Sequence, residues 1–136
     1  MGLDYGTTRI GVALSDGLRL GANPHMVISM EDQDLDTQLA RIADEYVVTV
    51  VVVGLPTSLD GTEHASADAA RGLADRVRDA IDLPVVLYDE RYTTKVAERA
   101  LLAADTSRRK RKQTIDKVAA AVMLQGFLDR LAGHRR

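Results

Sequence analysis

The sequence of 136 residues contains no cysteine and no tryptophan, only one phenylalanine and four tyrosines. Without cysteine the chain can form neither disulfide bonds nor thiolate metal sites, and it has no cysteine nucleophile. The three histidines, His25, His64 and His134, do not have the spacing of zinc ligands. The core must therefore be built mainly from Val, Leu, Ile and Ala, and any metal site must use oxygen ligands.

Long apolar runs are also missing from the sequence. No stretch reaches the roughly 18 residues that a membrane-spanning helix needs. Asp4 and Arg9 stand where a signal peptide would need its apolar segment. Apolar residues make up 46% and charged residues 28% of the chain, which is typical of a globular protein. We therefore expect a single domain over residues 1–136, with no membrane partner and a cytoplasmic location.

The charge of the chain is divided unevenly, although the net charge is only −2. Residues 1–105 hold 9 Lys and Arg against 18 Asp and Glu, whereas residues 106–136 hold 9 against 2. This pattern indicates either a basic surface for a polyanion or a solvated basic face near the C-terminus. Charge alone leaves both interpretations open.

The order of predicted elements indicates an α/β fold. Strands are expected at residues 2–5, 9–15, 26–30, 47–53 and 84–88, helices at 34–46, 65–81, 94–104 and 114–131, and a basic loop at 107–113. Three short strands in succession favour an antiparallel meander, and the later alternation favours parallel strands joined by right-handed crossovers. We predict a mixed five-stranded sheet, with three antiparallel strands followed by parallel strands and with helices on both faces.

Acidic residues occupy positions where such a sheet collects its functional groups. Asp4 ends the first strand, Asp89 and Glu90 follow the last strand, and Asp116 falls in the expected first turn of the final helix. Functional residues of α/β sheets gather at the carboxyl ends of the strands. If the first and last strands are neighbours, Asp4 and Glu90 meet at one edge, and the final helix can bring Asp116 to the same place.

Three ionised carboxylates in one place repel each other unless a cation lies between them. Hard oxygen ligands without histidine or cysteine favour Mg²⁺ or Mn²⁺, and a two-metal site of this kind suits hydrolysis of phosphodiester bonds. Each acid also has a structural interpretation. Asp116 can complement the dipole at a helix start, Asp4 can serve a turn, and Asp89, Glu90 and Arg91 can form a surface ion pair.

Two further segments could bind phosphate. In the turn after Asp4, Gly6 permits close backbone approach, and Thr7 and Thr8 offer hydroxyl and amide donors. The same Asp-x-Gly-Thr signature opens the actin-like ATPases and sugar kinases, but these need two copies of the fold and 136 residues supply only one. The second segment is the cationic run Arg108, Arg109, Lys110, Arg111 and Lys112, which suits a nucleic-acid backbone or is a solvated loop.

Four segments together resemble the YqgF/RuvX family of RNase H-like nucleases, which are relatives of the RuvC resolvases. They are LDYGTTRIGVALSD (3–16), VVVGLPTSLDGTEHASADA (51–69), YDERYTTKVAERALL (88–102) and RRKRKQTIDKVAAAVMLQGFLD (108–129). The resemblance covers nearly the whole chain and implies an RNase H-like fold with a carboxylate triad. Position by position, the triad corresponds to Asp4, Glu90 and Asp116 as catalytic and metal-binding residues, with Asp89 in reserve for Glu90.

The resemblance also implies an activity, that of a Mg²⁺- or Mn²⁺-dependent nuclease acting on structured nucleic acid. Maturation of the 5′ end of pre-16S ribosomal RNA is the main expectation. The alternative is a RuvC-like Holliday junction resolvase, which would need a homodimer, or a catalytically silent nucleic-acid-binding module. Residues expected near the scissile phosphate are Thr7, Thr8, Arg9, Arg91 and Lys95, with Arg108 to Lys112 binding the backbone beyond. Nucleotide binding by the Gly6 turn is a further possibility from a different class.

Overall fold

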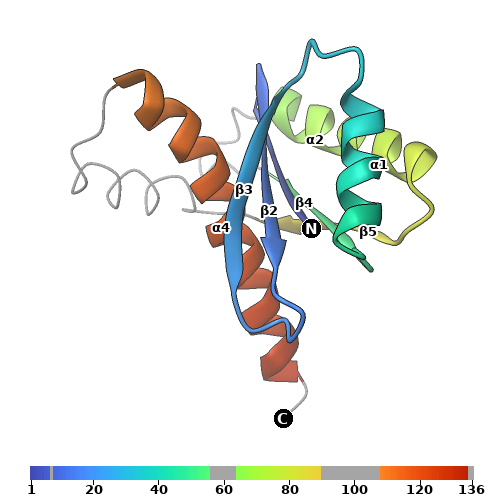
Figure 1. Ribbon diagram of the computed structural model, residues 1–136, viewed down its shortest axis with the longest axis vertical. Coiled ribbons are helices and arrows are strands. Elements are labelled where there is room, and N and C mark those ends of the chain that lie inside the picture. Colours follow the sequence, from blue (N-terminus) through green and yellow to red (C-terminus); the bar gives the residue numbers. More distant parts are fainter. Residues whose placement is uncertain (7, 56–63, 90–107, 135–136) are drawn as a thin grey trace.

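The computed structural model describes residues 1–6, 8–55, 64–89 and 108–134. Eight elements follow one another in these ranges (Figure 1). They are β1 (Gly2–Tyr5), β2 (Arg9–Ser15), β3 (Ala22–Ser29), α1 (Leu35–Glu45), β4 (Val51–Leu55), α2 (His64–Ala80), β5 (Val85–Asp89) and α4 (Arg108–His134). The helix expected over 94–104 lies outside the described residues. Within them, no helix combines the length and the apolar character needed to cross a membrane.

The strands form one mixed sheet in the order β3-β2-β1-β4-β5. Strands β1, β2 and β3 pair antiparallel, and β4 pairs parallel with both β1 and β5. This confirms the prediction of three antiparallel strands followed by parallel strands. However, β4 lies between β1 and β5, so the first and last strands are not neighbours. The carboxyl ends of β1 and β5 are therefore about 10 Å apart, two strand spacings, rather than side by side.

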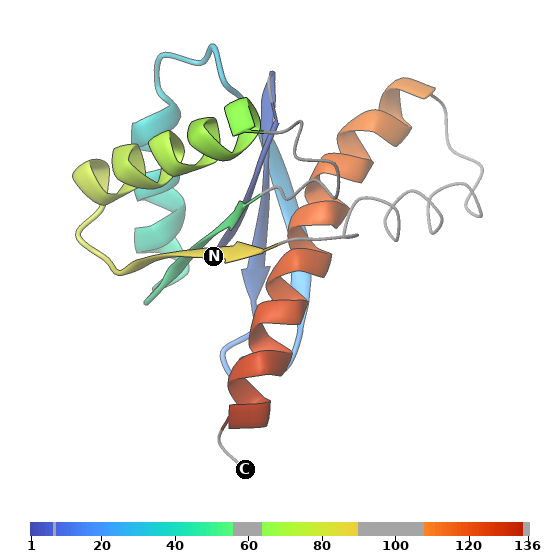
Figure 2. The same ribbon diagram turned by 180° about the vertical axis from the view of Figure 1, so that it is seen from behind.

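Helices cover both faces of the sheet, as expected. Helices α1 and α2 pack on one face and α4 crosses the other, as the two opposite views show (Figures 1 and 2). Because side chains alternate along a strand, each strand contributes to both cores. Leu3, Val51 and Val53 belong to the core under α1 and α2. Ala13 and Val52 belong to the core under α4, together with α4 residues Ala120, Ala121, Met123, Leu124 and Leu128.

The valine-rich run 47–53 does not form one strand, so the predicted start of β4 is wrong. Val47 has a φ of 51° and an exposed fraction of 79%. The Val48 N–H donates to the Ala43 carbonyl at 2.8 Å, and the Val47 N–H donates to the Asp44 carbonyl at 3.3 Å. These two hydrogen bonds close the end of α1 around a residue with positive φ, a position that glycine usually occupies. The first residues of the run therefore complete a helix, and the strand begins only at Val51.

Two other boundaries differ from the prediction. Strand β3 begins at Ala22 rather than at residue 26, because this edge strand tolerates Pro24. The predicted basic loop is wrong, since α4 already begins at Arg108 and contains the whole cationic run. Lys and Arg are strong helix formers, and neither Gly nor Pro interrupts residues 108–125. Asp116 consequently lies more than two turns inside α4, which excludes its interpretation as a helix-start residue.

Candidate active site

Asp4 lies at the carboxyl end of β1 and on the face that α4 covers. Its strand neighbour on that face is Gly2, where a Cβ would be 3.0 Å from the Leu124 Cβ of α4. Residues two apart on a strand share a face, so Asp4 lies on the α4 side one step beyond this contact. The Asp4 side chain is half-buried. A glycine at position 2 thus lets the helix approach β1 directly beside the acid.

The turn after Asp4 is tight because of Gly6. A Cβ at Gly6 would be 2.6 Å from the Arg9 carbonyl oxygen, a distance that no other residue could adopt without moving the backbone. Thr8 is exposed at this turn, and its carbonyl oxygen accepts a hydrogen bond from the Met30 N–H at 2.9 Å. The turn therefore presents Thr8 next to the end of β1, and Thr7 lies outside the described residues.

Arg9 shares the face of Asp4. Asp4 pairs with Gly11 across the β1–β2 ladder, and Arg9 lies two residues before Gly11 on the same side of β2. Such diagonal positions are about 7–8 Å apart, which is within reach of an arginine side chain. Arg9 is half-buried. The hairpin therefore brings a cation and a carboxylate to one corner of the sheet.

The alternation of side chains along β5 shows on which face of the sheet Asp89 lies. Tyr88 packs on α4, with its ring edge-on to Phe127 at 5.8 Å between centroids. Val85 and Leu87 pack instead with the core under α1 and α2. Asp89 follows Leu87 in this alternation and so lies on the face opposite to Asp4. The register argues against Asp89 as the partner of Asp4 and leaves Glu90, which lies outside the described residues together with Arg91 and Lys95.

The direction of α4 is set by Gln125. Its side-chain carbonyl oxygen accepts a hydrogen bond from the Ala22 N–H at 2.9 Å, and its amide nitrogen donates to the Leu20 carbonyl at 3.0 Å. These residues lie where β3 begins, at the end of the sheet away from Asp4. The earlier turns of α4 therefore run toward the Asp4 end, as Figure 1 shows.

The backbone position of Asp116 follows from this direction. Asp116 precedes Met123 by seven residues, which returns a helix to within about 20° of the same side. Met123 is only 1% exposed and lies against Gly2 of β1. The backbone of Asp116 is thus about two helical turns closer to the Asp4 end of the sheet than that of Met123. The part of α4 that contains Asp116 therefore lies toward the same end of the sheet as Asp4.

The donor chemistry of this corner fits a hard divalent cation. Among the residues described in the structure, no three histidine or acidic side chains form a group that could hold a metal. Of the three acids expected to form a triad, Asp4 is the one whose side chain the structure describes. A carboxylate oxygen is a ligand that Mg²⁺ and Mn²⁺ prefer. Asp4 has the residue type and the location for one ligand of such an ion.

Two positions that hold the end of β5 were missed by sequence analysis. A Cβ at Gly126 would lie 3.2 Å from the Tyr88 hydroxyl oxygen, so the absence of a side chain there makes room for the ring. The Arg130 guanidinium lies 5.8 Å from the centroid of the same ring. An isolated glycine inside a helical pattern is a signal of close packing, and it could have identified Gly126 in advance.

Together the mixed sheet, the acid at the end of β1 and the crossing helix α4 define a protein with the RNase H-like fold of the RuvC nucleases. Thermus thermophilus RuvC in complex with a Holliday junction substrate superposes with a TM-score of 0.56 at 18% identity, over 96% of this chain and 93% of that chain. The chain belongs to the RuvX family, described as "Holliday junction resolvase", which it matches over residues 1–130.

Relatives from several bacteria match nearly the whole chain. A protein of Geobacillus kaustophilus is 48% identical over 132 residues, covering 95% of this chain and 96% of the relative. A protein of Myxococcus xanthus is 47% identical over 130 residues, covering 95% of this chain and 86% of the relative. Both carry the name "Putative pre-16S rRNA nuclease". The similarity therefore extends over the candidate active site and the basic start of α4 alike.

Proposed function

We propose that this protein is a nuclease that hydrolyses phosphodiester bonds in structured nucleic acid, with the 5′ end of pre-16S ribosomal RNA as its main substrate. The observation that carries the proposal is the position of Asp4 on the face of the sheet that α4 covers, while the earlier turns of α4 run toward the same end of the sheet. The names of the full-length relatives support the substrate.

Asp4, Glu90 and Asp116 would hold Mg²⁺ or Mn²⁺ as the catalytic ligands. When bound, a pair of such ions supplies Lewis-acid activation of the attacking water and of the leaving oxygen. Asp4 is half-buried, which limits the rotamers that its carboxylate can adopt beside the proposed metal ions. Asp89 lies on the face opposite to Asp4, because alternate residues of a strand share a face, and this favours Glu90 over Asp89 as the proposed third acid.

The turn and the hairpin would position the scissile phosphate. The tight Gly6 turn lets the backbone come close to a phosphate oxygen, and exposed Thr8 offers a hydroxyl donor there. Arg9, on the Asp4 face of β2, supplies a positive charge close to the phosphate. Thr7, Arg91 and Lys95 complete the proposed set of phosphate contacts.

The cationic start of α4 would bind the nucleic-acid backbone beyond the reacting phosphate. Arg108, Arg109, Lys110, Arg111 and Lys112 fall within the first two turns of this helix, with no acidic residue in its first turn. Positive charge at a helix N-terminus is unfavourable to the helix dipole, and a bound polyanion removes that penalty. Neutralising phosphates in this way makes binding strongly dependent on salt.

Holliday junction resolution is the second candidate, and two findings favour it. The family description names this activity, and the superposed RuvC holds a junction substrate. A resolvase cuts two opposed strands and therefore needs two active sites, so this candidate requires a homodimer. The catalytic residues would be the same in both cases.

A cleavage assay tests the proposal. Purified protein is incubated with a pre-16S RNA fragment carrying its 5′ extension, with a four-way DNA junction and with single strands, in Mg²⁺, in Mn²⁺ or after chelation. We expect the RNA fragment to be cut only in the presence of metal. Asp4→Asn keeps the size of the side chain but removes its charge, and should lower the rate more than about a hundredfold, since even partners that only orient metal ligands contribute 10–100-fold.

Asp82→Asn is the matched control, because Asp82 is an exposed acid before β5 and lies at the other end of the sheet from Asp4. It should cleave like the unmodified protein. Cleavage of the junction in preference to the RNA, by a dimer, would select the second candidate. If nothing is cut in either metal while nucleic acid still binds, or if Asp4→Asn cuts normally, the protein is a binding module and the proposed nuclease is wrong.

A further inference from the structure

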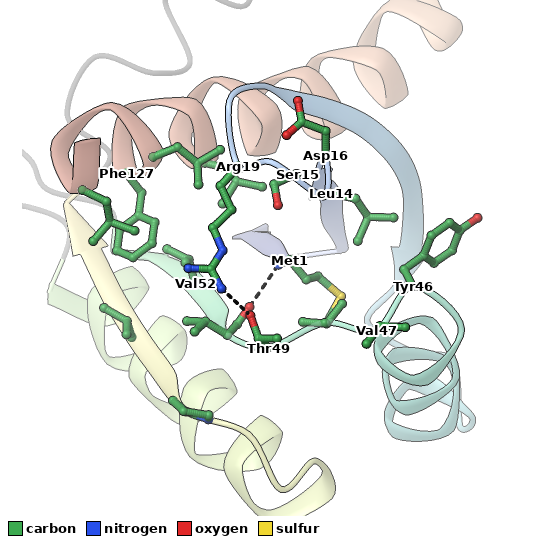
Figure 3. A pocket seen from close by; sticks show the side chains of 18 residues that line it. Met1, Leu14, Ser15, Asp16, Arg19, Tyr46, Val47, Thr49, Val52 and Phe127 are labelled. Carbon is green, nitrogen blue, oxygen red and sulfur yellow. Dashed lines mark hydrogen bonds between the residues drawn. The ribbon is translucent and has the colours of Figure 1, made fainter. Parts of the chain in front are cut away.

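A cavity of about 450 Å³ lies at the end of the sheet away from Asp4. It is open to solvent on one side and is bordered by four segments: the loop after β2, the segment between α1 and β4, the start of β5 and the C-terminal half of α4 (Figure 3). Its lining is mainly apolar and includes Leu14, Val48, Val52, Val86, Leu124 and Phe127. Pockets for small ligands have volumes of about 300–1,000 Å³ with a few polar groups among apolar ones. The cavity has the size and composition of such a pocket.

Backbone strain in the described part of the chain is concentrated at this cavity. Arg19 and Val47 are its two non-glycine residues with positive φ, at 58° and 51°, and both line the cavity. In this conformation the Cβ atom comes too close to the following carbonyl oxygen, so L-residues rarely adopt it. Strain of this kind gathers where a protein clamps a ligand.

Arg19 provides a positive charge at the cavity. Its Nη2 donates to the Thr49 Oγ1 at 3.5 Å, a long bond, and Arg19 has no ion pair among the described residues. Asp16 also lines the cavity, but its carboxylate is engaged by the backbone, since it accepts hydrogen bonds from the Leu20 and Gly21 N–H groups at 2.9 and 3.0 Å. Figure 3 shows Arg19 reaching across toward Thr49, whereas the Asp16 carboxylate points away from it.

The other basic group of the lining is largely uncharged at neutral pH. The Met1 amino group donates to the Val50 carbonyl at 3.0 Å, and burial lowers its pKa from 8.0 to about 6. Arg19 therefore determines which charge the cavity favours, and an anion is the complementary group. A guanidinium offers two parallel donors to a carboxylate, which fixes the orientation of the bound molecule.

We propose that this cavity binds a small amphipathic anion, with its apolar body among the apolar lining residues and its carboxylate on Arg19. Tyr46 and Val47 are exposed at 49% and 79% beside the cavity, and the apolar body would cover part of their surface. This site is separate from the proposed nuclease site, which lies at the other end of the sheet, and does not depend on it.

Decanoate is a suitable probe, because it joins a flexible apolar chain to one carboxylate. Titration into the ¹⁵N-labelled protein, followed by amide chemical shifts, locates and measures its binding. We expect saturable binding with a Kd below about 1 mM and shift changes centred on residues 14–19 and 47–50. Nonyltrimethylammonium, with the same nine-carbon chain and the opposite charge, should bind at least about tenfold more weakly, since a charge-assisted hydrogen bond is lost.

Arg19→Gln tests the charge, and Arg41→Gln is its matched control, an exposed arginine on α1 away from the cavity. The first should weaken decanoate binding at least about tenfold, and the second should leave it unchanged. Val86→Phe would fill the cavity from β5 and should also weaken binding, with circular dichroism confirming that each variant is folded.

Three results would overturn the proposal. The first is the absence of saturable decanoate binding. The second is that the Arg19→Gln variant binds decanoate as tightly as the unmodified protein does, or that the unmodified protein binds the cationic probe as tightly as decanoate. The third is a change in the same amide shifts when the protein alone is concentrated, because the cavity would then be covered by a second copy of the chain.

Discussion

The Tyr88 hydroxyl group of β5 lies against Gly126 of α4, where an added Cβ would be 3.2 Å from its oxygen. Phe127 and Arg130, which follow Gly126 in α4, contact the Tyr88 ring. The Phe127 ring centroid and the Arg130 Cζ atom each lie 5.8 Å from the Tyr88 ring centroid. One turn of α4 thus holds the residue that directly precedes Asp89 and Glu90. Because α4 also carries Asp116, this contact sets the helix position relative to the end of β5.

The first prediction concerns this contact. Gly126→Val should lower the free energy of unfolding by about 1–3 kcal/mol, the usual cost of forcing extra carbon atoms into a packed interface. Chemical denaturation with urea measures the change.

Gly72→Ala is the control, because Gly72 is also a glycine inside a helix. No atom lies within 4 Å of a Cβ added at Gly72 of α2, so the substitution should stabilise the protein by about 0.5–1 kcal/mol through helix propensity. Equal effects of the two substitutions would show that Gly126 is not needed for packing.

The second prediction concerns the strained end of α1. Val47→Gly should raise the free energy of unfolding by about 1 kcal/mol, because glycine adopts positive φ without the penalty of about 1–2 kcal/mol that other residues carry. The 79% exposed Val47 side chain contributes little burial that would be lost. Thermal unfolding measures the change.

Val48→Gly is the control for this position. Val48 is half-buried against the core under α1 and α2, and its φ is not positive. This substitution should lower the melting temperature, since it removes a packed side chain and adds backbone freedom. A lower melting temperature for Val47→Gly as well would contradict the strain at Val47.

The third prediction separates the two acids at the end of β5. Glu90→Gln should reduce cleavage more than about a hundredfold, whereas Asp89→Asn should retain most of the activity, because the strand register directs Asp89 to the face opposite Asp4. Initial rates in Mn²⁺ with the preferred substrate measure both. The reverse ranking would mean that the strand alternation breaks at Asp89.

The fourth prediction uses the helical form of the basic run. Arg109 and Lys112 precede Asp116 by seven and four residues and so share its side of α4, whereas Lys110 and Arg111 lie on other sides. The double variant Arg109→Gln/Lys112→Gln should weaken nucleic-acid binding and reduce its salt dependence by about one unit of slope per lost phosphate contact.

The double variant Lys110→Gln/Arg111→Gln has the same change in net charge and should have a smaller effect on both quantities. Fluorescence anisotropy over a series of salt concentrations provides the measurement. Equal effects of the two double variants would indicate that the run acts only through its total charge.

Several features could be predicted from the sequence because they depend on residues that are neighbours in the chain. Alternation and β-branched residues placed β1, β2 and β5 close to their observed bounds, and helical spacing placed α1 and α2. The position of Asp4 at a strand end could also be predicted from the local sequence, since the turn that follows it closes within four residues and requires Gly6. The role of Glu90 stays a prediction from the resemblance.

Other features depend on contacts between distant segments, and no local pattern contains them. The insertion of β4 between β1 and β5 is a choice of pairing partners, which depends on how the crossovers pack. The valines of residues 47–50 favour a strand intrinsically, yet they finish α1 and line a cavity, because tertiary packing outweighs a propensity of about 1 kcal/mol.

In helix α4, the sequence predicts the helical conformation, whereas tertiary contacts determine the direction of the helix. Its residues have the composition of a helix, but its direction follows from Gln125 bonding to the start of β3 and from Gly2 and Gly126 admitting close contacts. The Gln125 and Gly2 contacts join segments more than a hundred residues apart, and the Gly126 contact joins α4 to Tyr88 of β5, so each depends on the shape of the whole sheet. The residue types of the candidate site could therefore be predicted from the sequence, whereas the position of Asp4 relative to α4 depends on packing.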